Sequence, residues 1–354
     1  MKHRVTMLEI ARRAGVHVTT VSLALRNHPR LPAKTRERLQ RLAAQMGYRP
    51  DPALSALVAY RTHTRPPKDR PTLAYVTRWV TQWGWKDAPA HREFFEGATR
   101  KAEALGYQLE HFWLGAPGMT DRRMSGILDS RGITGVILAS HHPKAGTAAD
   151  FEWERFSAVK IDLSPREPPL HAVTNDQAAI IRLAMRQALA AGYRRIGLVM
   201  PRWWDEFVDL AWSAGFLAVQ QHLPAREQVP ILYYGDRIRP LGTMSTMTAP
   251  LPEFSRWYQR HRPDVILGRL PFIALRFEEL GVAVPRDVAF VEIFLENPDG
   301  SMAGVRENCA RVGEVAVETL AGQMQQNVYG VPEVPTVTLV EGTWFDGASL
   351  PKAR

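Results

Sequence analysis

Residues 5–28 read "VTMLEIARRAGVHVTTVSLALRNH", and this stretch places two short helical patterns on either side of one glycine. Thr6 and Glu9 have the spacing of a capping box at the start of the first pattern, and Gly15 ends it. The second pattern has an inward stripe of Val21, Ala24 and Leu25 and an outward row of Val18, Thr19, Ser22, Leu23 and Arg26. A third helical pattern begins near Lys34, so this part of the chain predicts a compact unit of three helices.

Positive charge is concentrated in the same part of the chain. Residues 1–70 hold 15 Lys and Arg against 4 Asp and Glu, whereas the remaining residues hold 30 against 32. A local excess of this kind predicts a polyanionic partner, and a small helix pair with an exposed row fits the major groove of DNA. The alternative is a solvated helical cap on a larger domain.

The run of residues 5–58, "VTMLEIARRAGVHVTTVSLALRNHPRLPAKTRERLQRLAAQMGYRPDPALSALV", resembles the DNA-binding headpiece and hinge of the lactose-repressor (LacI/GalR) family of bacterial transcription regulators. The resemblance implies a helix-turn-helix headpiece over residues 1–49, a hinge helix and linker over residues 50–71, and an effector-binding core over residues 72–354. It also implies a homodimer on a pseudo-palindromic operator of double-stranded DNA. The side chains that it places against DNA are Thr6, His17, Val18, Thr19, Thr20, Ser22, Leu23, Arg26, Asn27, Tyr48 and Leu57.

Several positions depart from the family's pattern. Leu23 stands where relatives often carry an arginine or another polar reader of bases, and His17 stands where a serine usually begins the second helix. Pro32 replaces a usual capping residue, and Leu54-Ser55 replace the usual Ala-Arg pair of the hinge. Because Leu23 offers only apolar contact, we expect an operator that differs from the commonest family sequence.

The hinge segment contains a short helical pattern between prolines. Pro50 and Pro52 lie at its start, and the prolines from Pro66 onward end it. A helix this short is marginal alone, and the resemblance implies that two copies pack together over DNA while Leu57 wedges into the minor groove. The alternative is a flexible linker with a chance leucine.

From Thr72 onward, apolar strand-like runs alternate with amphipathic helical stretches. The predicted strands are "TLAYVT", "YQLEHFWL", "GVILAS", "AVKIDL", "RIGLVM", "PILYYG", "DVILG", "DVAFVEIF" and "TVTLVEGTWF". The predicted helices cover residues 91–105, 176–191, 205–221, 271–280 and 309–327. Alternation of this kind predicts α/β lobes with parallel sheets.

The predicted fold class is an N-terminal all-α helix-turn-helix headpiece plus an α/β, two-lobed, periplasmic-binding-protein-like core. We expect the first lobe to cover about 72–174 and 304–330, and the second about 175–303 and 331–347. The family resemblance implies that the last helix and strand cross back between the lobes, with a ligand cleft between them.

Aromatic residues lie near the predicted strand ends, where the ligand sites of such sheets form. In many relatives an arginine before a Gly-Phe pair and an aspartate after a late strand grip sugar hydroxyls, but Trp212 and Phe294 take these places here. The expected effector contacts are Trp79, Trp83, His91, Asp176, Arg202, Trp203, Trp204, Asp205, Trp212, Arg269 and Phe294. We expect a saccharide or derivative, larger or less polar than a free monosaccharide, that stacks on these rings. The alternative for each tryptophan is ordinary packing, and for each polar residue a cap or a solvated charge.

No catalytic motif, cofactor or metal site is expected. The sequence has no G-x-G-x-x-G after a strand, no Walker loop, no G-x-S-x-G and no H-E-x-x-H, and His141-His142 lack a nearby ligand set. One cysteine, Cys309, and no long apolar run point to a cytoplasmic protein without a membrane segment. The predicted function is therefore a sequence-specific transcription regulator, expected to be a repressor, and not an enzyme. The alternatives are a regulator with a non-sugar effector or none, and an α/β enzyme fused to a DNA-binding domain.

Overall fold

The computed structural model describes residues 5–25, 31–48, 70–141, 149–235 and 248–353. Its first part contains three helices, α1 (Met7–Ala14), α2 (Val18–Leu25) and α3 (Ala33–Gln45). They enclose a small core of Ile10, Ala11, Val21, Ala24, Leu39 and Ala43. The predicted three-helix unit is confirmed, and its apolar stripes are the ones that the sequence pattern indicates.

The ends of α1 are fixed by local chemistry. The backbone N–H of Thr6 donates to Glu9 Oε2 at 2.7 Å, and the Glu9 N–H donates back to Thr6 Oγ1 at 3.3 Å. Gly15, at φ 66°, ends the helix in the left-handed conformation that glycine adopts without strain. Val18 differs from its expected outward position, because it is half-buried and packs against the headpiece core.

The first lobe is built on a six-stranded parallel sheet in the order β11-β5-β4-β3-β1-β2. Its strands are β1 (Thr72–Arg78), β2 (Gln108–Trp113), β3 (Gly135–His141), β4 (Ser157–Ile161), β5 (His171–Asn175) and β11 (Val337–Val340). Helices α5 (Pro89–Ala104) and α13 (Cys309–Gln326) cover one face, and α6 (Asp121–Ser130) covers the other. Alternate residues of β1 point to opposite faces, so both faces are apolar, as a buried parallel sheet requires.

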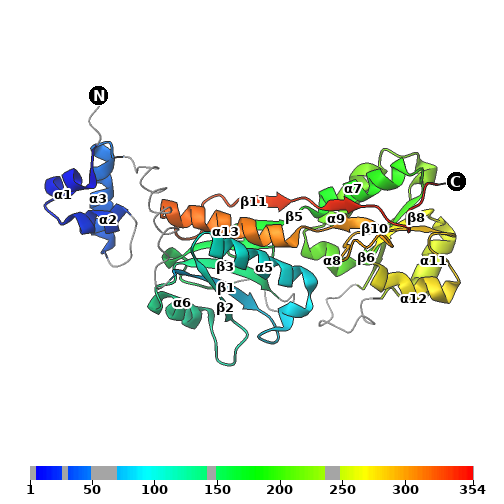
Figure 1. The fold of residues 1–354 in the computed structure, drawn as a ribbon, viewed down its shortest axis with the longest axis horizontal. Helices are drawn as coiled ribbons and strands as arrows, with labels where there is room; N and C mark the ends of the chain where they lie inside the picture. Colours follow the sequence, from blue (N-terminus) through cyan, green and yellow to red (C-terminus); the bar gives the residue numbers. More distant parts are fainter. Residues whose placement is uncertain (1–4, 26–30, 49–69, 142–148, 236–247, 354) are drawn as a thin grey trace.

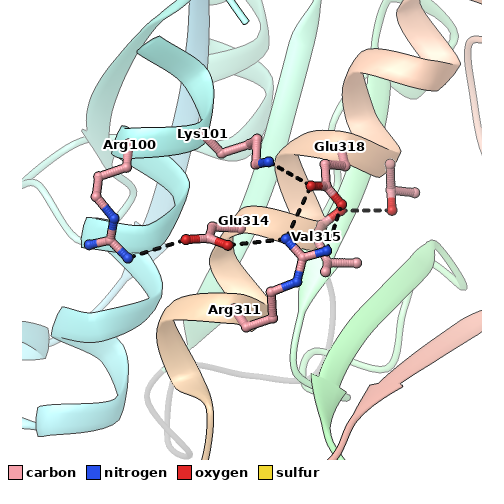
Figure 2. A network of polar contacts seen from close by, with 7 residues as sticks. Arg100, Lys101, Arg311, Glu314, Val315 and Glu318 are labelled. Atoms are coloured by element: carbon pink, nitrogen blue, oxygen red, sulfur yellow. Dashed lines mark hydrogen bonds and ion pairs between the residues drawn. The ribbon is translucent and has the colours of Figure 1, made fainter. Parts of the chain in front are cut away.

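Helices α5 and α13 come from distant parts of the chain and touch at their backbones. A side-chain carbon at Gly97 would overlap the carbonyl of Ala310, and one at Gly313 would overlap the carbonyl of Phe94. Beside this contact a chain of ion pairs links the helices (Figure 2). It consists of Arg100–Glu314, Glu314–Arg311, Arg311–Glu318 and Glu318–Lys101, with N···O distances of 2.7–3.3 Å.

The second lobe repeats the architecture beside the first (Figure 1). Its sheet has the order β12-β10-β9-β8-β6-β7, parallel except for β12. The strands are β6 (Ile196–Pro201), β7 (Leu232–Tyr234), β8 (Val265–Gly268), β9 (Ala289–Glu292), β10 (Ala303–Arg306) and β12 (Thr343–Phe345). The helices are α7 (Gln177–Ala190), α8 (Arg202–Phe207), α9 (Ala211–Gln220), α11 (Leu251–His261) and α12 (Leu270–Leu280). Helices α7 and α9 pack on one face, and α11 and α12 on the other.

The remaining elements are short 3₁₀ turns: η1 (Gly84–Asp87), η2 (Trp153–Arg155) and η3 (Ala225–Glu227). No helix in the described ranges is long and apolar enough to cross a membrane.

The chain passes between the lobes three times, between β5 and α7, between β10 and α13, and between β11 and β12. This arrangement differs from the expected division in two places. Residues 303–306 pair within the second sheet, and residues 337–340 pair with β5 in the first. The expected single strand over 336–345 is therefore split at Gly342, where a side-chain carbon would lie 2.5 Å from Val305 Cγ1. The strand pattern alone does not reveal this crossing, because its residues remain extended on both sides.

The predicted helix over residues 205–221 is also two helices, α8 and α9. Asp209 and Leu210 lie between them with φ values of 57° and 62°. Two successive residues in the left-handed conformation turn the chain. The apolar periodicity continues through this turn, so the sequence pattern does not indicate it.

Candidate functional site

The exposed face of the headpiece is formed by α2 and the residues before it. The carbonyl of His17 accepts from Thr20 N at 2.9 Å, and its Nδ1 lies 2.7 Å from Thr19 Oγ1. His17 therefore stands at the N-terminus of α2, and its Nδ1 also accepts from Thr19 N at 3.4 Å. Thr19 is exposed, whereas Thr20, Ser22 and Leu23 are half-exposed.

The other expected DNA contacts have mixed positions. Thr6 belongs to the cap of α1, and Tyr48 is half-buried against the headpiece core. Arg26, Asn27 and Leu57 lie outside the described residues. Five exposed cations on the described headpiece were not among the predicted DNA contacts: Arg12, Arg13, Lys34, Arg38 and Arg41. The local charge excess is the signal that indicates them as phosphate contacts.

Four of the expected effector residues directly follow the carboxyl end of a strand. Trp79 follows β1, Asp176 follows β5, Arg202 follows β6 and Arg269 follows β8. This placement agrees with the rule that ligands of such sheets bind beyond the carboxyl ends. Asp176 also has a structural role, because its Oδ1 accepts from Ala179 N at 2.7 Å and caps α7.

The tryptophans after β1 differ in exposure. Trp79 is 6% exposed and meets the ring of His91 edge-on, with ring centroids 5.0 Å apart. Burial lowers the pKa of His91 to about 4, so its ring is neutral at pH 7. Trp83 is 48% exposed, and Lys86 Nζ lies 4.2 Å from the centroid of its ring.

Asp205 and Trp212 lie inside the second lobe. Asp205 is fully buried, where it accepts from the hydroxyl of Tyr233 at 2.5 Å and from Ser213 N at 3.2 Å. These bonds join α8 to α9 and β7. Trp212 is 1% exposed and belongs to the core cluster beneath α7 and α9. Its ring contacts the half-buried Trp204 at 5.4 Å between centroids, so Trp204 is the more accessible ring of the pair.

Two cation and aromatic pairs stand at the edge of the second sheet. The guanidinium of Arg202, which is exposed beside the half-buried Trp203, lies 4.5 Å from the centroid of Tyr233. The guanidinium of Arg269 lies 4.6 Å from the centroid of Phe294. Arg269 also forms an ion pair with Glu296. The second lobe thus presents aromatic rings and guanidinium groups at this edge.

The first lobe and the second crossover bring together an acidic cluster, which we define as Tyr75, Asp162, Asn175 and Glu307. Asp162 Oδ1 accepts from Thr174 Oγ1 at 3.0 Å, and Glu307 Oε2 accepts from Asn175 Nδ2 at 3.1 Å. All four side chains are buried. Burial raises the pKa of Asp162 to about 6, and burial together with the charge of Asp162 raises that of Glu307 to about 8.

The acidic cluster was not predicted from the sequence. Asp162 directly follows β4 and Glu307 directly follows β10, so each is an acidic residue placed at the end of an apolar strand. The same rule that selected Trp79 and Arg269 selects them. Their proximity is not visible in the sequence, because the second crossover brings Glu307 to the first lobe.

Polar contacts join the lobes around this edge. Arg166 pairs with Asp209 at 2.8 Å, and Arg306 pairs with Glu93 at 3.3 Å. Asn308 Nδ2 donates to the carbonyl of Glu341 at 2.6 Å, which ties the second crossover to the third. In the described ranges no group of three or more His, Cys, Asp or Glu side chains is placed to hold a metal ion.

Comparison with known proteins identifies the N-terminal unit. The family model described as "Bacterial regulatory proteins, lacI family" matches residues 6–51. The HTH-type transcriptional regulator DegA of Bacillus subtilis (strain 168) is 22% identical over 200 residues, which cover 56% of this chain and 55% of DegA. The match thus spans about half the length of that relative.

Solved structures resemble the whole chain. The transcriptional regulator CelR in complex with cellobiose has a TM-score of 0.55 at 18% identity, covering 98% of this chain and all of CelR. The lac repressor dimer bound to operator and the anti-inducer ONPF has a TM-score of 0.53 at 17% identity, covering 99% of this chain and all of that chain. The N-terminal unit is thus a helix-turn-helix domain of the LacI family, and the chain as a whole has the fold of these solved regulators.

Proposed function

We propose that the protein is a homodimeric, sequence-specific transcription regulator, acting as a repressor, whose core binds a small effector between the lobes. The observation that carries the proposal is the joining, in one chain, of a LacI-type DNA-binding domain to a core with the LacI-regulator fold. Two headpieces then contact two half-sites of a pseudo-palindromic operator.

The proposed DNA-reading face is α2. Thr19 is exposed, Leu23 is half-exposed, and His17 Nδ1 accepts from the backbone N–H of Thr19 in the first turn. Leu23 supplies apolar contact such as that made to thymine methyl groups, while the exposed arginines of α1 and α3 contact phosphates. Arg26, Asn27 and Leu57 remain proposed DNA contacts on the family pattern alone.

The proposed effector lies at the carboxyl ends of both sheets. Trp79, Trp83 and His91 would face it from the first lobe, and Arg202, Trp203, Trp204, Arg269 and Phe294 from the second. A saccharide or derivative is favoured, because aromatic faces stack on sugar rings and CelR, a structural relative, is in complex with cellobiose.

Effector binding is proposed to control DNA binding through the three crossovers. A ligand that touches both lobes has different affinity for open and closed arrangements, and this difference shifts the population between them. Because the headpieces are attached to the first lobe through residues 49–69, the shift would change the spacing of the two hinges.

Selection of bound DNA from a random pool by the full chain tests the function. We expect a two-fold symmetric sequence, because two identical headpieces read it. A His17→Ala, Thr19→Ala double variant should select that sequence with lower enrichment, while an Arg286→Ala variant on the far lobe should match the parent. Enrichment of no sequence, or of one without symmetry, would contradict the proposal.

A further inference from the structure

The acidic cluster contains two buried carboxyl groups that have no cationic partner among the residues that the structure describes. Among the described residues, Thr174 is the side chain that donates to Asp162, and Asn175 and the Cys309 thiol are those that donate to Glu307. No ion pair reaches either carboxyl group within the described ranges. A buried carboxylate without a counter-charge is strongly disfavoured, so an ionised pair here requires a cation from outside the chain.

Two further atoms of the cluster lack partners. Asn175 Oδ1 and the Tyr75 hydroxyl are buried and have no hydrogen-bond partner in the described structure. Asn175 Nδ2 donates to Glu307, so the Oδ1 atom of the same amide lies close to that carboxyl group. Burial raises the pKa of the Tyr75 phenol, and the charge of the nearby Asp162 raises it further. The amide oxygen is an acceptor and the phenolic hydroxyl can accept as well as donate, so both atoms can receive a hydrogen bond from an N–H donor.

The charged groups around the cluster are already engaged. Arg269 favours the ionised form of Glu307, but it is paired with Glu296 and stacked on Phe294. Glu93 opposes ionisation, and it is paired with Arg306. The Cys309 thiol is neutral, since burial raises its pKa. The remaining local charge is therefore that of Asp162 and Glu307.

The backbone also holds Asp162 in an unusual conformation. Its φ is 69°, in the left-handed region that aspartate and asparagine tolerate better than most residues. Asp162 N donates to the carbonyl of Val173 at 3.0 Å, and this hydrogen bond fixes the conformation at the end of β4. An asparagine at this position keeps both the conformation and the acceptor for Thr174.

We infer that the acidic cluster receives a protonated amine, so that the effector is a cation of saccharide size, such as an amino-substituted sugar. The inference rests on the proposed effector site between the lobes and names the chemistry of its ligand. The ammonium group donates to Asp162, Glu307 and Asn175 Oδ1, while the aromatic groups of the second lobe, Trp204 and Phe294, face the body of the ligand.

Matched ligands test the inference on the full chain by calorimetry at pH 7. Cellobiose and the β-1,4 disaccharide of glucosamine share ring size and linkage, and differ by amines in place of two hydroxyls. The N-acetylated form of the second disaccharide is a neutral control, and glucose with glucosamine provides a smaller pair. We expect the amine to bind at least tenfold more tightly than its neutral partner in at least one pair.

Charge-removing variants locate the preference. Asp162→Asn and Glu307→Gln keep the acceptors for Thr174 and Asn175, and each should reduce the amine preference to threefold or less. Glu110→Gln removes a half-exposed carboxylate that is paired with Arg131 in the same lobe, and should retain the parent preference. Near-ultraviolet circular dichroism of each variant checks that it is folded.

Proton release gives a second readout. With its raised pKa, Glu307 is mainly neutral at pH 7 in the free protein. Pairing with an ammonium group should ionise it and release a proton. Calorimetry in two buffers of different ionisation enthalpy measures the number of protons released. Equal or tighter binding of the neutral ligand in every pair, a preference that survives both variants, or binding of neither member of any pair would overturn the inference. None of those results would affect the selection of a symmetric DNA sequence, which tests the regulator assignment separately.

Discussion

The headpiece and the core place their functional groups in opposite ways. In the headpiece, the proposed reading residues His17, Thr19 and Leu23 lie within one helix and its cap, so a short stretch of chain supplies them all. In the core, the acidic cluster takes Tyr75 from β1, Asp162 from the end of β4 and Glu307 from the second crossover. The first site therefore depends on a small local fold, whereas the second depends on the packing of distant segments.

The stability of the two regions follows the same contrast. The headpiece buries six apolar side chains, so each cap and each core residue is a large fraction of its stability. The core buries its sheets on both faces in four clusters, and the close contact of α5 with α13 joins chain segments of both halves. Changes in the two regions should therefore be separable.

The largest effect is expected from removal of the headpiece. A chain beginning at Pro71 lacks the basic segment and should lose DNA binding entirely, while its core still dimerises and unfolds at the parent temperature. Gel-shift assays with the selected operator and calorimetric scans measure the two properties. DNA binding by the shortened chain would show that the two regions do not divide their roles in this way.

The next effect concerns the contact of α5 with α13. Gly313→Ala should cost about 3 kcal/mol of unfolding free energy, because the new carbon overlaps the Phe94 carbonyl and the helices must separate. Gly322→Ala lies in the same helix in open space, and should instead stabilise by up to about 1 kcal/mol. Urea denaturation of both variants measures the difference, and equal values would refute the backbone contact.

The smallest effect is expected at the cap of α1. Thr6→Ala removes the acceptor of the Glu9 N–H and should cost the headpiece about 1 kcal/mol, without any change in the core. Amide hydrogen exchange resolves the two regions in the full chain. Thr35→Ala, in the first turn of α3 where no side chain caps the helix, is the control and should leave headpiece protection nearly unchanged. Faster exchange in the core of the Thr6 variant would contradict the separation.

Much of the fold follows from local patterns. The caps at Thr6 and Gly15, the apolar stripes of α1 to α3, and the alternation of strands with helices are all properties of neighbouring residues. The breaks at Leu210 and Gly342 were not predicted, because an apolar period continues across each of them while a turn or a crossing redirects the chain.

The candidate effector site was predicted less completely. The strand-end rule placed Trp79 and Arg269 at the carboxyl ends of strands, where the structure has them, but the tryptophan pattern also selected Trp212, which is buried in the second lobe. A tryptophan pattern does not separate an accessible ring from a core ring, since both carry the same apolar surface. Burial depends on what packs above the ring, and only the fold supplies that.

The headpiece, its basic charge and the alternating α/β character of the core could be predicted from the sequence, because caps, charge and periodicity act over a few residues. The pairing of residues 337–340 in the first sheet and of 343–345 in the second became visible only in the folded chain. Folding also brings Glu307 beside Asn175 and buries two carboxyl groups that have no cationic partner within the described ranges. These outcomes depend on contacts between segments far apart in the chain, and the energy of such contacts is set by packing and burial, which no local pattern encodes.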